Sequence, residues 1–255
     1  MISVVLLGAG NVATHLYKAL KASDTITVTQ WYNRNIKRIS TYANEVDITD
    51  SLNDIKEADI YIISVSDDAV AELSQSLPFN NRFVVHTSGT VSLYDLDKKN
   101  RRGVFYPLQT FTQGADLDFS DVPFCLEAIE NSDLSLLQSL AAALGSPNYK
   151  ISTEQRKRLH LAAVFVNNFT NQLYRIGHEI SEANLSDFDI LKPLILETAK
   201  KVQTMSPYMA QTGPAVRRDK KTIKKHLKLI ENPHHKAIYE LLTDSIAYTH
   251  GRKKL

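Results

Sequence analysis

The glycine turn after the first predicted strand constrains this chain more than any other stretch. Residues 2–7 are β-branched or aliphatic apart from one serine, Gly8 and Gly10 follow, and an amphipathic segment begins directly afterwards. Gly8 permits a tight turn, and Gly10 has no Cβ to keep a pyrophosphate off the backbone. A helix that starts there offers free amides and a positive dipole end to phosphates. We therefore predict dinucleotide binding rather than an ordinary strand-helix turn, with cofactor contacts from Gly8, Gly10, Asn11 and Val12.

The end of the second predicted strand, residues 25–32, distinguishes between two cofactors. An NAD site has an acidic side chain about 20 residues past the glycines, where it binds the ribose hydroxyls. Here the neutral Asn33 and the basic Arg34 stand instead. Because a guanidinium can neutralise a 2′-phosphate, NADP(H) is preferred over NAD(H), with Asn33 and Arg34 as contacts. Lys37 and Arg38 either add to this charge or form the solvated face of the next helix.

Composition and charge limit the class of protein. The chain has 255 residues, 43% hydrophobic and 23% charged, which is typical of a globular protein. No apolar run reaches the length of a membrane span and no secretory signal is present, so a cytoplasmic protein without membrane contact is expected. The single cysteine, Cys125, lies in a predicted strand and is expected to be a packed thiol; no metal site is predicted.

The charge is unevenly distributed along the chain. Residues 1–150 hold 12 Lys and Arg against 18 Asp and Glu, whereas residues 151–255 hold 18 against 10. The halves therefore carry about −6 and +8. This asymmetry indicates two domains and an anionic ligand held where they meet.

Strand and helix patterns alternate through the first half and stop near residue 152. Apolar runs at 58–65 and 82–86 are typical of buried parallel strands, with helices predicted at 51–57, 67–76 and 133–144. From Thr153, taken as a helix cap, no Gly or Pro occurs until residue 177, and a long, largely buried helix to about 183 is predicted. Further helices are predicted at 186–205, 222–230 and 233–250.

The predicted fold class is α/β, with an N-terminal doubly wound Rossmann sheet over residues 1–152 and an all-α domain over 153–255. In such sheets, ligands bind at the turns that follow the strands. Ser64, Val65 and Ser66 follow the fourth strand, and Thr87 and Ser88 follow the fifth. We expect Ser64, Val65, Ser66 and Thr87 to contact the cofactor and Ser88 to lie beside the nicotinamide.

With these turns placed, the chain resembles the superfamily of pyrroline-5-carboxylate reductases, deazaflavin-dependent NADP reductases, β-hydroxyacid dehydrogenases and prephenate dehydrogenases. Residues 33–34 look like the NADP-selecting turn of the reductases, 86–89 like a substrate-binding serine turn, and 106–108 like the His-Pro turn of prephenate dehydrogenases. Across nearly the whole chain it is similar to an uncharacterised branch whose C-terminal domain is the domain of unknown function 2520. The markers of that branch are residues 106–111, 160–163 with 167–168, and 212–214 followed by Arg217.

One departure from the relatives affects the chemistry. Hydroxyacid dehydrogenases and ketopantoate reductases carry a catalytic lysine one helical turn before an asparagine on the interdomain helix. Here Val164 precedes Asn168 at that spacing, and the polar partner is His160, two turns back. Residues 160, 164, 167 and 168 share one helical face, so His160 and Asn168 are expected to line one cleft.

Two classes of function follow. The first is an NADP(H)-dependent oxidoreductase acting on a small anionic carbonyl, imine or hydroxy substrate between the domains. In it His160 exchanges a proton, because imidazole titrates near neutrality. Ser88 and Asn168 bind the reacting group, and Gln109 and Arg217 bind the substrate. The second class is a non-catalytic dinucleotide sensor or partner subunit, in which His160 satisfies a backbone group.

Two further expectations concern partners. The basic stretch 217–228 has no interleaved aromatic residues, so nucleic-acid binding is not predicted. The long apolar helix suggests burial against more protein than one chain provides. By resemblance, a homodimer formed through the helical domain is expected.

Overall fold

The computed structural model describes residues 1–251. The chain forms two compact units, one of residues Met1–Asn168 and one that begins at Phe169. The change from sheet to helix comes at the predicted domain boundary near residue 152, but the first helix after it belongs to the first unit. The first unit therefore carries both the sheet and the helix that holds His160.

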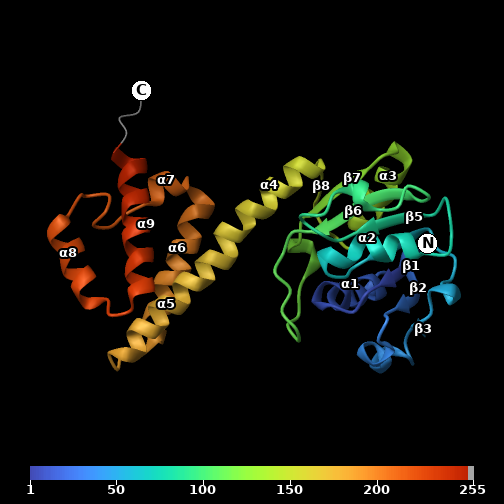
Figure 1. Cartoon of the computed structure of the whole chain (residues 1–255), viewed down its shortest axis with the longest axis horizontal. Helices are drawn as coiled ribbons and strands as arrows, with labels where there is room; N and C mark the ends of the chain where they lie inside the picture. The colour runs from blue at the N-terminus through green and yellow to red at the C-terminus, as the bar shows by residue number, and fades with distance from the viewer. Residues whose placement is uncertain (252–255) are drawn as a thin grey trace. The chain divides into compact units, whose positions relative to one another are not determined.

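The first unit, which Figure 1 shows, is built on a sheet with helices packed against it. The sheet has eight strands in the order β3-β2-β1-β4-β5-β6-β7-β8. All neighbouring strands are parallel except β6 and β7, which are antiparallel. The chain turns outward from β1 and later returns to β4, so the switch point at which doubly wound sheets bind ligands lies between these two strands. The strands are β1 (Ile2–Leu7), β2 (Ile26–Tyr32), β3 (Ile48–Thr49), β4 (Ile60–Ile63), β5 (Phe83–His86), β6 (Arg101–Pro107), β7 (Phe124–Ala128) and β8 (Asn148–Lys150).

Helices cover both faces of this sheet, which explains why its strands are apolar without alternation. Val4 and Leu6 of β1 belong to a core cluster with α1 (Asn11–Ala22) and α3 (Asn131–Ala143). Val5 and Leu7 point to the opposite face, in a cluster with α2 (Asp67–Ser76). Successive side chains of a strand point to opposite faces, so a strand buried on both sides needs apolar residues at every position. The predicted α/β fold class is confirmed.

Two local predictions in the first unit need correction. Residues 51–57 form no α-helix; a single 3-10 turn, Leu52–Asp54, lies there. Helix α4 (Thr153–Ala163) is capped by Ser152 rather than Thr153, in a capping box with Gln155. The Thr153 hydroxyl instead donates to Glu127 Oε2 at 2.8 Å, and this hydrogen bond holds the start of α4 against β7.

The second unit is all-α, as predicted, although the order of its helices differs in detail. Asp187, not Ser186, caps a 3-10 turn at Phe188–Leu191, because its carboxylate accepts from the Asp189 amide at 2.9 Å. The following helix begins only at Lys192, with a proline in its first turn. The helices are α5 (Thr170–Ala183), α6 (Lys192–Thr204), α7 (Pro207–Ala210), α8 (Lys220–Leu229) and α9 (Pro233–Gly251).

The predicted helix over 153–183 is neither uniform nor buried in this chain. A π-helical segment, Val164–Phe169, separates α4 from α5. Along this stretch Leu161 is 58% exposed and Val166 is 75% exposed. The predicted helical spacing is confirmed, but within this chain the helix is largely exposed. The expectation that more protein than one chain buries it stays a prediction. No helix in residues 1–251 is long and apolar enough to span a membrane.

Candidate functional site

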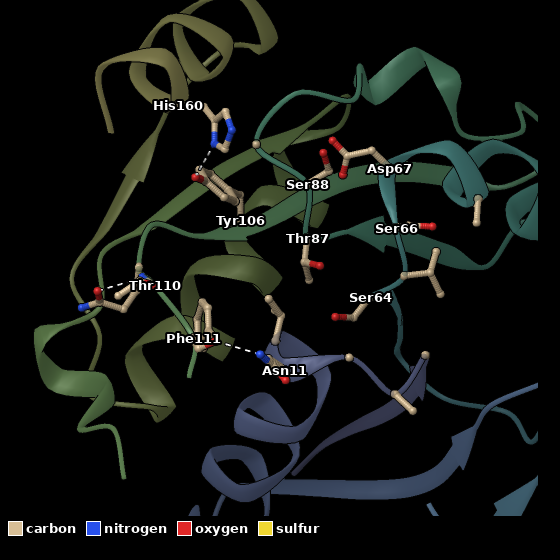
Figure 2. Close-up of a pocket in the computed structure, with 18 of the residues that line it drawn as sticks. Asn11, Ser64, Ser66, Asp67, Thr87, Ser88, Tyr106, Thr110, Phe111 and His160 are labelled. Carbon is tan, nitrogen blue, oxygen red and sulfur yellow. Dashed lines mark hydrogen bonds between the residues drawn. The ribbon is translucent and has the colours of Figure 1, made fainter. Parts of the chain in front are cut away.

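A cavity of about 1310 Å³ opens in the first unit at the ends of β1, β4 and β5. Figure 2 shows Asn11, Ser64, Thr87 and Ser88 around it, on turns that are far apart in the sequence. Every predicted site residue of this unit lines the cavity: Gly8, Gly10, Asn11, Val12, Asn33, Arg34, Ser64, Val65, Ser66, Thr87, Ser88, Gln109, His160 and Asn168. Arg217 belongs to the second unit, and its role toward a substrate stays a prediction.

The glycine turn has the geometry that the sequence required. Gly8 has φ +121°, and a Cβ added there would lie 2.1 Å from the backbone oxygen of Ser64. Gly10 is the N-cap of α1 and has no side chain to bond the first amides. A Cβ on Gly10 would meet nothing within 4 Å, so open space lies in front of the helix start. Free amides facing open space fit a pyrophosphate.

The turn after β2 places positive charge at one end of the cavity. Asn33 Nδ2 donates to the carbonyl of Asn35 at 2.7 Å, and Asn35 Oδ1 in turn accepts from the Lys37 amide at 3.2 Å. These bonds shape a 3-10 turn from which Arg38, together with Arg34, lines the cavity, whereas Lys37 does not. The two alternatives for Lys37 and Arg38 are thereby separated: Arg38 adds to the charge at the cavity.

The start of α1 also holds the segment after β6. Asn11 Nδ2 donates to the Phe111 carbonyl at 2.9 Å, and His15 Nε2 lies 2.9 Å from the Thr112 carbonyl (Figure 2 shows the first of these). The Asn11 side chain is therefore engaged with the protein itself. Its backbone remains at the helix start, where it can contribute to phosphate binding.

The Ser88 turn is stabilised by its own hydroxyl groups. The amides of Thr90 and Val91 donate to Ser88 Oγ at 3.1 and 3.0 Å. Thr90 Oγ1 donates to Asp67 at the start of α2. Two backbone donors already use the lone pairs of Ser88 Oγ, and its own hydrogen faces Thr90 Oγ1 at a long 3.5 Å. Toward a ligand this hydroxyl can therefore act as a donor only in exchange for that contact.

The other end of the cavity is formed by β6 and α4. His160 Nδ1 lies 3.1 Å from the hydroxyl oxygen of Tyr106 (Figure 2). Val164, Asn167 and Asn168 line the same cavity from the π-helical segment. Val164 stands at the position where the resemblance to hydroxyacid dehydrogenases leads one to expect a lysine. The expectation that His160 and Asn168 share one cleft is confirmed. π-helical turns inside helices are frequent at functional sites.

Three features of the site were missed by sequence reasoning. Tyr106 was quoted only as a family marker, although the rule that ligands bind at strand ends applies to β6 as well. A Cβ on Gly89 would lie 2.6 Å from His160 Nδ1, so this glycine leaves room for the imidazole. Arg156, fully buried on α4, pairs with Glu127 of β7 at 2.5 Å and donates to the Val91 carbonyl at 2.6 Å. No local sequence pattern joins Arg156 and Glu127.

Two other titratable residues near the site are buried and structural. Burial raises the pKa of the Cys125 thiol to about 11, so the expectation of a packed thiol is confirmed. His86 is fully buried at the end of β5, and its Nδ1 accepts from the Ser88 amide at 3.1 Å. Burial, reinforced by Arg156, lowers the pKa of His86 from 6.5 to about 3. Imidazole at this position is therefore neutral near pH 7.

The buried His86 predicts loss of stability in mild acid. Because its pKa is lower in the folded state, its contribution to stability is complete above the unfolded pKa of 6.5 and is lost as the pH falls from 6.5 toward 3. Between pH 7 and pH 5 we expect about 2 kcal/mol of lost stability from this residue. Urea unfolding of the wild type and His86→Gln at both pH values measures it. An equal loss in both proteins would contradict the assignment.

The chain is similar to known families and to solved structures. A family described as NADP oxidoreductase coenzyme F420-dependent matches residues 3–89, and the domain of unknown function DUF2520 matches residues 122–246. A solved structure of a proposed NADP oxidoreductase from Bacteroides fragilis is 39% identical, covers 98% of both chains and has a TM-score of 0.86. The chain belongs to this NADP oxidoreductase-like DUF2520 family.

More distant structures share the fold of the DUF2520 protein. A protein from Thermotoga maritima is 21% identical over 98% of this chain and 100% of its own, with a TM-score of 0.74. An imine reductase from a Pseudomonas species is 16% identical over 97% and 91%, with a TM-score of 0.71. No curated protein matches the sequence.

Among residues 1–251, no group of three potential metal ligands is close enough to hold an ion.

Proposed function

We propose that this DUF2520 protein is an NADP(H)-dependent oxidoreductase acting on a small carbonyl, imine or hydroxy compound. The observation that carries the proposal is one continuous cavity in the first unit. It is lined by the open glycine turn, by Arg34 and Arg38, and by the His160–Tyr106 pair. The family supports NADP(H) as the cofactor. When bound, NADP(H) supplies or accepts the hydride, and the protein supplies orientation and a proton.

The residues of the first unit fit this cofactor. The start of α1 has no side-chain cap and open space lies at Gly10, which suits the pyrophosphate, and the two arginines suit a 2′-phosphate. Ser64, Val65, Ser66 and Thr87 stand where the nicotinamide half would follow. His160 then exchanges a proton with the substrate, while Ser88 and Asn168 bind its reacting group.

Cofactor selectivity gives a direct test. We expect Arg34→Ala to weaken NADPH binding about 10- to 100-fold, since a charge-assisted hydrogen bond contributes about 1.5–3 kcal/mol. NADH has no 2′-phosphate, so its affinity is expected to change by less than about threefold. Calorimetric titration of both cofactors measures this. Lys37→Ala is the matched control, because Lys37 does not line the cavity. No binding of either cofactor to the wild type would overturn the proposal.

We propose that the substrate is anionic and that Arg217 of the second unit binds it. Within residues 1–251, the cavity is lined by two arginines, Arg34 and Arg38, and by no lysine. A substrate carboxylate or phosphate would therefore need another cation. The positive half of the chain and Arg217 support this role. Arg217→Ala is expected to raise KM for an anionic substrate more than it lowers kcat, and an unchanged KM would remove the anionic requirement.

A non-catalytic dinucleotide sensor is the second candidate function. Val164 lines the cavity at the position where relatives have lysine, and this substitution is the observation that favours it. Turnover of NADPH with a panel of carbonyl acids and imines, lost in His160→Ala, supports the enzyme. Tight NADPH binding without turnover supports the sensor.

We further propose that the protein is a homodimer. Among the described residues of the second unit, Ala215 alone is buried. Large apolar side chains such as Leu173 (41% exposed) and Leu194 (62% exposed) lie at its surface. A helical unit with so small a core needs a further apolar surface to be stable. A second copy of the chain supplies a surface with the same apolar character and can bury both at once.

Light scattering tests the dimer. The wild type is expected at twice the chain mass of 28.7 kDa, and Leu173→Asp at the monomer mass or with a higher dissociation constant. Arg175→Ala, at a 65% exposed side chain on the same helix, is the matched control and should remain dimeric. A monomeric wild type would overturn the proposal.

A further inference from the structure

The hydrogen bond between Tyr106 and His160 fixes the orientation of the imidazole ring. Tyr106 is the last residue but one of β6 and is 9% exposed, whereas His160 lies on α4 (Figure 2). The phenol oxygen lies 3.1 Å from Nδ1, and the rings meet edge to face with centroids 6.1 Å apart. Among residues 1–251, no protein hydrogen-bond partner is found for Nε2, the second nitrogen of His160. One nitrogen is thus held and the other is available to the cavity.

The surroundings keep the imidazole in this place. A Cβ on Gly89 would come within 2.6 Å of Nδ1 and 2.9 Å of the Tyr106 ring, so the serine turn packs closely against both side chains. One turn before His160, the buried Arg156 attaches α4 to Glu127 and to the Val91 carbonyl. The backbone that carries His160 is therefore fixed to the sheet that carries Tyr106.

A phenol suits this position because its hydroxyl can both donate and accept. When the imidazole is neutral, the hydroxyl donates to Nδ1 and the ring proton lies on Nε2. When the imidazole is charged, the same oxygen accepts from Nδ1–H. Burial raises the pKa of Tyr106 to about 12, so the phenol keeps its proton near neutral pH. In both of these states Nε2 carries a hydrogen. The charged form can pass that hydrogen to the substrate, which leaves a neutral ring whose remaining hydrogen lies on Nδ1 and is donated to the Tyr106 oxygen.

We infer that Tyr106 is a positioning residue that holds Nδ1 of His160, so that Nε2–H is the group presented to the substrate. The substrate must then offer a lone pair at its reacting group, as a carbonyl oxygen or an unprotonated imine nitrogen does. This inference rests on the proposed function, in which His160 meets the substrate. It assigns Tyr106 no contact with the reacting atoms.

Nitrogen NMR of the full chain labelled with ¹⁵N-histidine reads the position of the ring proton. The His160 signals are identified by their absence in His160→Gln. In the neutral wild type we expect the Nε2–H form to dominate. In Tyr106→Phe we expect the Nδ1 signal to shift and a larger share of Nδ1–H. A wild-type proton on Nδ1, or spectra of His160 that Tyr106→Phe leaves unchanged, would overturn the inference.

The chain contains a matched control. In the second unit the Tyr239 hydroxyl lies 2.8 Å from His226 Nδ1, which is the same pair of groups, and neither residue lines the cavity. Tyr239→Phe should alter His226 and leave His160 unchanged, and Tyr106→Phe should do the reverse. Gly89→Ala is a second variant that displaces the imidazole without removing the phenol. It should also change the His160 signals, and an unchanged spectrum would contradict the packing argument.

The outcome is separable from that of the proposed function. NADPH titration and turnover test the oxidoreductase, whereas the NMR measurement needs neither cofactor nor substrate. If NMR shows the expected tautomer but NADPH does not bind, the proposed function is wrong and the positioning role of Tyr106 stands. If NADPH is turned over but the neutral His160 ring carries its proton on Nδ1, the proposed function stands and the positioning role of Tyr106 is wrong.

Discussion

Gly8→Ala is expected to destabilise the protein by more than about 3 kcal/mol and to abolish NADPH binding. At φ +121° an alanine is strained by about 1–3 kcal/mol, and its Cβ would lie 2.1 Å from the Ser64 backbone oxygen. Relaxation is restricted, because the Gly8 amide donates to Tyr32 at 2.9 Å and its carbonyl accepts from the Trp31 indole at 2.6 Å. Urea unfolding and calorimetric titration measure the two effects.

Gly10→Ala is the matched control for that experiment. Gly10 has no atom within 4 Å of an added Cβ and has an ordinary negative φ of −82°. Its stability should therefore stay within about 1 kcal/mol of the wild type. NADPH affinity should nevertheless fall, because the new methyl group occupies space assigned to the pyrophosphate. A Gly8→Ala protein as stable as Gly10→Ala would show that the turn does not require the left-handed conformation.

Glu127→Gln is expected to cost about 3–5 kcal/mol, because it leaves a fully buried guanidinium without its charge partner. Arg156 has no exposed side-chain surface and bonds Glu127 Oε2 at 2.5 Å. The same carboxylate also accepts from the Thr153 amide at 2.9 Å and from its hydroxyl at 2.8 Å. The substitution therefore loosens the start of α4, and turnover should fall together with stability, because His160 lies one turn after Arg156 on the same helix. Urea unfolding and kinetics of the same preparation measure both.

Glu154→Gln provides the comparison on the same helix. Its partner Lys157 lies 3.5 Å away, and both side chains are largely exposed, so the loss should be within about 0.5 kcal/mol. A double variant, Glu127→Gln with Arg156→Met, should recover part of the lost stability, because it removes the unpaired buried charge. Equal effects of Glu127→Gln and Glu154→Gln would contradict the assignment of Glu127 as the anchor of α4.

Local patterns were sufficient for the sheet and for the cofactor end of the cavity. The apolar strands, the glycine turn and the crossover helix 67–76 each carry their signal within about a dozen residues, so the sequence predicts them directly. The strand-end rule then placed Ser64, Ser66, Thr87 and Ser88 at one cavity. Arg34 was found in the same way, because the position after β2 is fixed by its distance from the glycines.

The other end of the site depended on contacts that no local pattern contains. Tyr106 and His160 are 54 residues apart, and they meet only because β6 lies beside β5 and α4 is attached to β7. The long helix is exposed within this chain, because apolar periodicity shows which face seeks a partner but not whether the same chain supplies one. The sequence by itself therefore determined the positions of the apolar strands, the doubly wound class of the sheet and the cofactor turn, through local backbone and hydrophobic preferences, whereas the antiparallel pairing of β6 with β7 is known only from the structure. Only the tertiary structure decided which nitrogen of His160 is held, because that depends on the close packing of three distant segments around one imidazole.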